Sequence, residues 1–487
     1  MKDSSRALLA LIPLFAAVAL TLLWPGDVPW QIDEPRLIAN AWHANHDHEL
    51  VPGGLWGNFG IRYGPLPTWI YQGLLLVTHE PVTLAFLRAL LCVGTTAGAF
   101  YWLAKELKLP VWFAAALIAS PLVVEYHRIL WDASFALPLS ALTLAAFVAF
   151  LRTGGATPFL ITLAGTFLVP TIHPQGLPLA LPVFGWIVWK QRPALQRHFK
   201  AVLVLLLVLG LSHSLWFFEA VWGVAHNVSG SLSKGYPHGA SHLACALAPL
   251  FGGNLLGGQL AFGQVFAGEL PPAARVAQQL LGLIYPLAWI GIAVSLRRVW
   301  KAREFSPRDV LAATVLGGIV LQAALFGVLR IPPGPQYFFG TFGLHAVLAW
   351  LAVDELRFLR VGKLLGAVFG VTAFSATIAL AARVNAEGFN ATLGWPTLKA
   401  QVAVARALND YNDPEAHTDV RLYQQGPQAL RTLRLLMPPT PGTTQRRSGR
   451  LSLEESGEKL QLVERDAPSG LAIDVTPLPK GWIPEKW

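Results

Sequence analysis

Runs of about 20 mostly apolar residues recur along the chain, separated by short stretches that hold most of the Lys, Arg, Gly and Pro. Each run is long enough to cross a bilayer as a helix, so the pattern predicts an all-α polytopic bundle. Residues 201–211 (AVLVLLLVLGL) do not alternate in polarity, which argues against spanning strands. The runs predict about eleven spans, near residues 7–24, 82–104, 110–124, 132–151, 157–171, 174–189, 201–221, 279–296, 309–329, 337–352 and 364–382.

Lys and Arg fall on alternate loops between these spans, beginning with Lys105 and Lys108 after the second one. Because basic loops stay on the cytoplasmic side, this placement predicts a cytoplasmic N-terminus and, with eleven spans, an external C-terminal tail. The first run follows Lys2 and Arg6 as a signal peptide would. No small-residue cleavage site follows it (PGDVPW), so we expect an uncleaved first span.

Composition agrees with a chain that is largely dissolved in lipid. Hydrophobic residues make up 54% of it and charged residues 13%, and the mean hydropathy is +0.47. The net charge of +9 lies mostly in short loops, where it sets orientation, and the outer loops hold too little Lys and Arg to suit nucleic acid. The two cysteines are too few for a disulfide framework and lack the spacing of a zinc site.

The predicted organisation has two parts. Residues 1–382 form a transmembrane module with large outer loops at 25–66 and 222–278, and residues 383–487 form an extracytoplasmic C-terminal domain. The loop at 222–278 is rich in Gly and His and only modestly apolar, which predicts interfacial or re-entrant segments lying on the bundle.

The C-terminal domain is predicted to be small and mixed α/β. Residues 398–408 have helical spacing, and residues 450–453 and 459–463 alternate in polarity as short strands do. A linker rich in Pro, Thr and Arg separates the helix from the strands.

The first outer loop carries an acidic motif directly after the first span. The sequence DEPR (residues 33–36) is followed by apolar residues at helical spacing, and YGPLP (residues 63–67) then leads into more apolar sequence. This layout resembles the GT-C superfamily of polyprenyl-phosphate-dependent glycosyltransferases, especially the protein O-mannosyltransferase and aminoarabinose-transferase type. The resemblance covers residues 1–200, with a weaker likeness at 330–350, and rests on motif order combined with topology.

The resemblance implies a hexosyl- or pentosyltransferase of the cell envelope. Its donor would be a sugar on an undecaprenyl-phosphate-type carrier, and its acceptor a hydroxyl of an envelope glycan, lipid or protein. It further implies a bacterial inner membrane protein that acts on the periplasmic side, among membrane lipids, with inversion at the anomeric carbon if one displacement occurs. No cofactor is implied, and a need for a divalent metal is left open.

Asp33 is the candidate catalytic base. An acceptor hydroxyl is a poor nucleophile, so a carboxylate must take its proton as the anomeric carbon develops positive charge. Glu34 is the candidate for support or orientation. A helix N-cap is the alternative role for Asp33, because Asp followed by Glu and Pro starts a helix in any protein.

The leaving group would be a lipid phosphate, which is a stable anion and needs cationic or hydrogen-bond donors rather than a general acid. Eight candidates for contact with the phosphate or sugar lie at the predicted outer face: Arg62, Tyr63, Arg128, Asp132, His173, Gln175, Arg330 and Tyr337. Anchoring or turn formation at the membrane boundary is the alternative for most of them. Arg62-Tyr63-Gly64 stands where related proteins commonly have a Glu-Lys pair, so the donor sugar is left open.

Two other features are ambiguous in the sequence. The segment HANHDHE (residues 43–49) is rich in metal ligands, but no second ligand pair at a familiar spacing completes a zinc motif, so a solvated polar loop is predicted. Arg88 lies inside the second predicted span, where it needs a partner or a cavity.

Two alternative functions remain at this point. A lipid-linked sugar flippase or other transporter would be expected to show paired broken spans and polar residues at the membrane midplane, whereas the polar groups here gather at one face. An inactive scaffold with an outer receptor domain is the third possibility, favoured if Asp33 proves replaceable.

Overall fold

The computed structural model describes most of the chain. The described residues are 2–30, 33–57, 60–109, 111–234, 241–250, 284–302, 305–331, 334–356, 375, 378, 382, 385–386, 389–390, 395–410, 426–437, 450–456, 459–465 and 472–477. Most of the predicted span at 364–382 and most of the predicted loop at 222–278 therefore lie outside the described residues.

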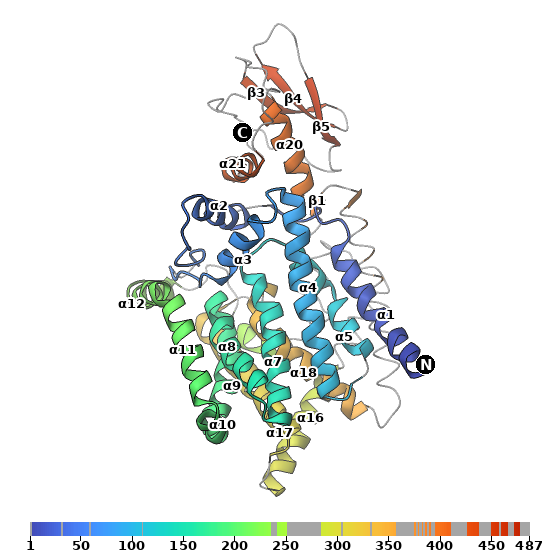
Figure 1. Cartoon of the computed structure of the whole chain (residues 1–487), viewed down its shortest axis with the longest axis vertical. Coiled ribbons are helices and arrows are strands. Elements are labelled where there is room, and N and C mark those ends of the chain that lie inside the picture. Colours follow the sequence, from blue (N-terminus) through green and yellow to red (C-terminus); the bar gives the residue numbers. More distant parts are fainter. Residues whose placement is uncertain are drawn as a thin grey trace.

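The main part of the molecule is a bundle of helices, most of them running along its long axis (Figure 1). The first half of the bundle contains α1 (Lys2–Leu22), α4 (Pro81–Glu106), α5 (Val111–Ile118), α6 (Pro121–Arg128), α7 (Ala136–Thr153), α8 (Ala156–Ile172), α9 (Leu177–Lys190) and α10 (Arg192–Arg197). The second half contains α11 (Phe199–Ser212), α12 (Ser214–Lys234), α13 (His242–Leu250), α16 (Ile284–Ala302), α17 (Pro307–Leu329) and α18 (Phe342–Leu356). Short 3₁₀ turns join some of them: η1 (Ala133–Phe135), η2 (Pro174–Gly176) and η4 (Pro335–Thr341).

Local sequence sets several helix ends. At the start of α4 the Glu80 carboxylate accepts a hydrogen bond from the Thr83 amide at 2.6 Å, and Pro81 occupies the first turn, where its missing N–H costs nothing. The α17 helix begins with a capping box formed by Ser306 and Asp309.

The α7 helix lies at the centre of the bundle and packs against α4, α8, α18 and η4 (Figure 1). Of the apolar window in this span, 83% is buried inside the protein, against 50% for α4, so α7 meets protein rather than lipid on most sides. Contact with α8 is close because Gly165 leaves room for the Thr143 side chain.

Helices of spanning length and exposed apolar side chains fit a polytopic membrane protein. Among the described residues, three helices are long and apolar enough to cross a membrane, Pro81–Glu106, Ala133–Thr153 and Pro307–Leu329, and a bent pair raises that number to four. Much of α11 is coated with exposed apolar side chains: Phe199, Leu203, Val204, Leu206, Leu207, Val208 and Leu211. The total of eleven spans stays a prediction.

Two predicted spans are not continuous helices. Of the predicted span 110–124, the described residues 111–124 are divided between the short helices α5 and α6, because Ser120 has extended backbone and Pro121 starts a new helix after it. Residues 201–221 bend by 65° between α11 and α12. At this bend Ser212 and Ser214 both donate hydrogen bonds to carbonyls of the preceding turn, a pattern that bends helices. The α12 helix also continues to Lys234, into the region predicted as loop.

One end of the bundle, the upper end in Figure 1, carries α2 (Asp33–His46) and α3 (Leu66–Leu75). Above them lie α20 (Leu398–Asp410), α21 (Gly426–Leu436) and an antiparallel sheet of β3 (Arg450–Ser456), β4 (Lys459–Arg465) and β5 (Ala472–Pro477), in the order β3-β4-β5. A two-stranded pairing joins β1 (Phe389–Asn390) to β2 (Trp395–Pro396). The predicted helix and two strands of the tail are thus present as α20, β3 and β4. A separate extracytoplasmic domain at 383–487 stays a prediction.

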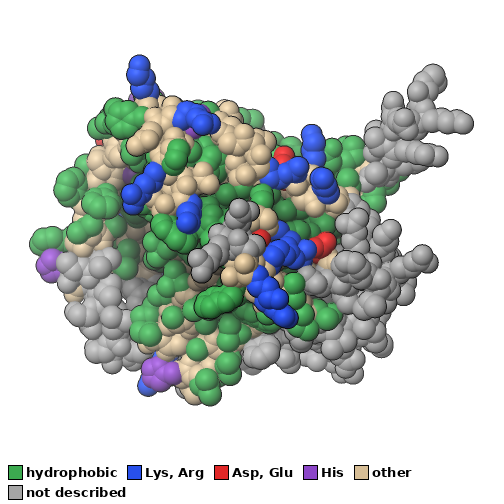
Figure 2. Space-filling model, turned by 90° about the horizontal axis from the view of Figure 1, so that it is seen from below, with side chains coloured by type: hydrophobic (Ala, Val, Ile, Leu, Met, Phe, Trp, Pro, Cys, Tyr) green, Lys and Arg blue, Asp and Glu red, His purple; other side chains and the backbone are tan. Residues whose placement is uncertain are grey.

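The opposite, lower end carries a concentration of positive charge. Figure 2 shows several Lys and Arg side chains on this face among apolar ones. Basic residues occupy the last turns of four helices that end here, at Lys105, Arg152, Lys190 and Lys301. The charge pattern used to predict orientation therefore corresponds to one face of the folded molecule.

Candidate functional site

Asp33 is the first residue of α2 and lies at the upper end of the bundle. The Trp131 indole nitrogen donates a hydrogen bond to Asp33 Oδ2 at 3.1 Å. Burial raises the pKa of Asp33 above its ordinary value, while the Trp131 hydrogen bond and the positive charge of Arg36 oppose that rise. A carboxylate in this setting is partly desolvated and becomes a stronger base than one in water. Residues 31 and 32, which bear on the N-cap alternative, lie outside the described residues.

A second carboxylate, Asp132, lies close enough to Asp33 to repel it electrostatically. Asp132 is the N-cap of η1, where its Oδ1 accepts a hydrogen bond from the Ala133 amide at 2.7 Å. Its Oδ2 is buried and has no hydrogen-bond partner within the described part of the chain. The fold therefore brings together two carboxylates that are about a hundred residues apart in sequence.

Glu34 points in a different direction from Asp33. Glu34 is buried and interacts electrostatically with Tyr71. Tyr71 is fully buried and also interacts electrostatically with Arg88. Arg88 itself donates hydrogen bonds to the carbonyls of Tyr126 and His127 and to the Ser134 hydroxyl. Arg88 thus has its partners in the last turn of α6 and in η1.

Three of the predicted residues, Tyr63, His173 and Tyr337, form a row of rings. The ring centroids of Tyr63 and His173 lie 5.3 Å apart, and those of His173 and Tyr337 lie 6.1 Å apart. Tyr337 and Phe339 both belong to η4. The ring of Phe339 lies 6.1 Å from that of Trp131, which binds Asp33, so η4 links the row of rings to Asp33.

His173 is uncharged at neutral pH, since burial lowers its pKa to about 4. Its Nδ1 accepts a hydrogen bond from the Gln175 amide at 3.4 Å, which leaves the proton of the neutral ring on Nε2. Gln175 Oε1 is buried without a hydrogen-bond partner among the described residues. These two side chains can therefore offer neutral hydrogen bonds to a ligand, and His173 offers no positive charge.

Arg62 precedes Tyr63 in the chain and contacts α12, the helix that follows the 65° bend. Its guanidinium forms an ion pair with Glu219 at 2.7 Å and donates a hydrogen bond to the Gly54 carbonyl at 3.1 Å. The Trp216 indole donates to the Arg62 carbonyl at 2.8 Å. Arg62 is thus a cation whose charge already has a protein partner.

Arg128 lies away from the ring row. It is buried and donates a hydrogen bond to the Trp24 carbonyl at 2.8 Å, next to Asp27. These contacts join α6 to the segment that follows α1.

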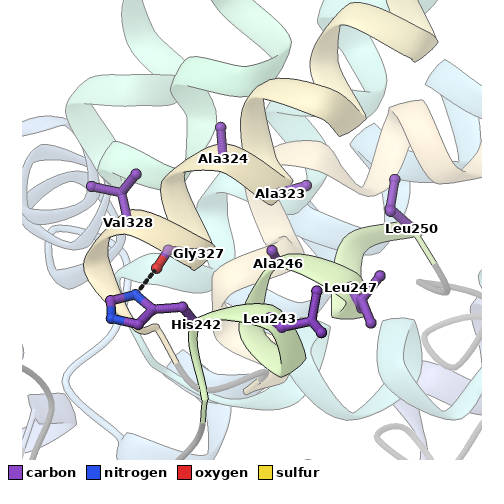
Figure 3. A pocket seen from close by; sticks show the side chains of 9 residues that line it. All are labelled: His242, Leu243, Ala246, Leu247, Leu250, Ala323, Ala324, Gly327 and Val328. Atoms are coloured by element: carbon purple, nitrogen blue, oxygen red, sulfur yellow. Dashed lines mark hydrogen bonds between the residues drawn. The ribbon is translucent and has the colours of Figure 1, made fainter.

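Arg330 also lies apart, at the C-terminal end of α17. Its Nε donates to His242 Nε2 at 2.7 Å, and His242 Nδ1 lies 2.7 Å from the Gly327 carbonyl. His242 forms the polar rim of an open groove of about 750 Å³ between α13 and α17, whose other lining side chains are apolar (Figure 3). The groove is lined by His242, Leu243, Ala246, Leu247, Leu250, Ala323, Ala324, Gly327 and Val328.

Sequence reasoning missed the partners that define the site. Trp131 was not singled out, and only its position next to Asp132 could have drawn attention to it. Arg36 follows Asp33 at i+3, a spacing that places both on one helix face and was a readable signal. Within the described residues, no group of three or more His, Cys, Asp or Glu side chains is arranged to hold a metal ion.

Comparison with known proteins supplies a fold match. No family model matches the sequence, and no curated protein matches it. The crystal structure of ArnT from Cupriavidus metallidurans in the apo state is similar over 93% of both chains, with a TM-score of 0.55 and 13% sequence identity. The chain has a GT-C fold. ArnT from the same organism bound to undecaprenyl phosphate matches 90% of this chain and 92% of that one, with a TM-score of 0.51 and 13% identity.

The similarity to ArnT confirms the fold that the sequence resemblance implies. At this identity the likeness establishes the architecture. The chemistry of the GT-C site has to be argued from this chain's own residues.

Proposed function

We propose that this protein is a membrane glycosyltransferase that moves a sugar from a polyprenyl-phosphate carrier to an acceptor hydroxyl. The observation that carries the proposal is the Asp33 carboxylate, partly desolvated and held by Trp131 at the end of the bundle opposite the basic face. A fold shared with an enzyme solved in complex with undecaprenyl phosphate supports the class of donor.

In the proposed reaction Asp33 removes the proton from the acceptor hydroxyl as that oxygen bonds to the anomeric carbon. The bond between the anomeric carbon and the phosphate oxygen breaks, and polyprenyl phosphate leaves with the electron pair as a stable anion. One displacement inverts the configuration at that carbon. Asp132 acts beside Asp33, and its repulsion favours transfer of the proton onto the pair.

Donor binding is proposed to use the apolar groove between α13 and α17. An isoprenoid chain suits the apolar walls of this groove, and Arg330, which donates to His242 at its rim, supplies a positive charge for the phosphate. Neutral donors at His173 and Gln175 are then available for sugar hydroxyls in the ring row.

The proposed orientation places the basic lower end in the cytoplasm and the site on the periplasmic side of a bacterial inner membrane. The upper end carries α2, α20 and α21, which would meet an envelope glycan, lipid or protein acceptor.

The test is transfer of radiolabelled sugar from polyprenyl-phosphate donors to an envelope extract by purified wild type and by Asp33→Asn. We expect Asp33→Asn to lower the transfer rate by a factor of about 10²–10⁴, the usual contribution of a general base. Asp47→Asn is the matched control, because Asp47 is exposed just after α2 at the same end of the protein. Equal transfer by wild type and Asp33→Asn would contradict the assignment. No transfer with any donor, together with donor flipping in liposomes, would favour a transporter.

A further inference from the structure

The segment that carries Asp33 is enclosed by two helices from the distant C-terminal part of the chain. The Gln401 amide on α20 donates a hydrogen bond to the Trp30 carbonyl at 2.8 Å. The Thr432 hydroxyl on α21 donates one to the Pro35 carbonyl at 3.2 Å. Both donors are buried, and their acceptors lie three residues before Asp33 and two residues after it.

The residues just before this segment are also hydrogen-bonded to the start of α20. The Leu398 amide donates to the Val28 carbonyl at 2.8 Å, and the Lys399 amide donates to the Gly26 carbonyl at 2.9 Å. Gly26 is needed at this point, because an added Cβ would lie 2.8 Å from Lys399 Cβ. Residues 26–30 are therefore bound to α20 by backbone as well as side-chain contacts.

An ion pair strengthens the same contact. Lys399 Nζ lies 2.6 Å from Oδ1 of Asp27, whose side chain is 1% exposed. On its other side the Asp27 carbonyl faces the Arg128 guanidinium at 3.4 Å. Residues 26–30 are consequently fixed between the bundle below and α20 above.

The two C-terminal helices are also joined to each other. Arg434 on α21 donates a hydrogen bond to Asn409 Oδ1 on α20 at 2.9 Å, and α21 packs along α2. A displacement of α21 therefore moves α20 and α2 with it.

We propose that Gln401 and Thr432 are positioning residues for the base, so that α20 and α21 set the place of Asp33 relative to Trp131. This inference rests on the proposed function and deepens it. The C-terminal helices would act on catalysis without touching substrate, by preventing α2 from turning or tilting away from the end of η1. Displacement of a catalytic group by about 1 Å can cost a hundredfold in rate.

The test compares the full-length protein with Gln401→Met and Thr432→Val, which keep side-chain size and remove each hydrogen-bond donor. We expect each variant to lower kcat about tenfold, and the double variant further, with KM for the donor within twofold of wild type. Thr432→Ser retains the hydroxyl and should restore the wild-type rate. Arg406→Met is the matched control, because Arg406 on α20 pairs with Glu80 at the start of α4 and not with the Asp33 segment.

The pH profile distinguishes positioning from general loss of folded protein. A loosened α2 admits water, which lowers the pKa of Asp33, and weakens the Trp131 hydrogen bond, which raises it. Burial is the larger cause, so the acid limb of the rate profile should move to lower pH. A smaller active fraction would lower the rate at every pH without moving the limb. An unmoved limb, or an equal loss in Arg406→Met, would overturn the inference.

Hydrogen–deuterium exchange tests the inference separately from the proposed reaction. In Gln401→Met/Thr432→Val the amides of α2 should exchange at least tenfold faster than in wild type, while those of α7 stay protected. If wild type shows no transfer activity but exchange rises in this way, the proposed function fails and the positioning contact stands. Unchanged exchange in α2 would overturn the positioning role whatever the activity.

Discussion

Replacement of Trp131 by Phe isolates the hydrogen bond that the structure gives to Asp33. Phenylalanine keeps a ring against Phe339 and Tyr126, whose centroids lie 6.1 and 6.4 Å from that of Trp131, and removes the indole N–H. A hydrogen bond to a charged group contributes roughly 1.5–3 kcal/mol, and the partial exposure of Asp33 favours the lower figure. About 1.4 kcal/mol corresponds to a tenfold change in an ionisation equilibrium.

The sign of the effect follows from which form of Asp33 the hydrogen bond stabilises. Trp131 favours the ionised carboxylate and opposes the rise in pKa caused by burial, so its removal raises the pKa of Asp33 further. Activity needs the ionised base, and it should therefore be lost at higher pH in Trp131→Phe than in wild type. We expect the acid limb of the transfer rate to move up by about one pH unit, with rates close to wild type on the alkaline side.

The assay is initial sugar transfer across a pH series, with wild type and Trp189→Phe measured in parallel. Trp189 is an exposed residue near the lower end of the bundle and controls for loss of an indole anywhere in the protein. An acid limb that stays in place, or moves to lower pH, would show that Trp131 does not stabilise the ionised base.

Two further predictions concern the bundle and are checked by thermal unfolding in detergent. Gly165→Ala would drive a Cβ into Thr143 where α8 meets α7, so we expect a loss of about 1–3 kcal/mol and a midpoint several degrees lower. Gly185→Ala, inside α9 with no atom within 4 Å of the new Cβ, should not lower the midpoint. Arg88→Met removes the donor to the buried Tyr126 carbonyl, and the unsatisfied acceptor should cost about 1–3 kcal/mol; a midpoint equal to wild type would mean that water replaces the guanidinium.

Hydropathy predicted the helical architecture because a run of about 20 apolar residues is long enough to cross a bilayer as a helix, whatever its neighbours are. The breaks were harder to predict, since they depend on single residues within otherwise apolar sequence. Pro121 ends the continuity of residues 110–124 through its effect on Ser120, and this signal was present in the sequence. The 65° bend near residue 213 depends on side-chain hydrogen bonds to the helix backbone, which composition does not reveal.

The candidate site could be predicted only where its parts are local. The motif that begins at Asp33 and its place at the start of a helix were readable, because charge, Pro and apolar spacing lie within a few residues. The hydrogen bond from Trp131 joins residues 98 positions apart, and the pairing of Arg62 with Glu219 joins residues 157 apart. Such contacts depend on which helices become neighbours. For the same reason the sequence does not reveal that Arg330 contacts His242 at the rim of a groove between α13 and α17.

The hairpin of α7 and α8 acts as a spacer of fixed length. Its closed end is a turn at Gly154, whose positive φ of 64° lets the chain reverse directly. Its open ends carry Trp131, which binds the base, and His173, the middle of the ring row. Because the two helices are packed together along their length, these ends cannot slide past each other. The separation of Trp131 from His173 is therefore set by the length of the hairpin. In the proposed reaction, inserting one residue in either helix would shift the base and the ring row relative to each other.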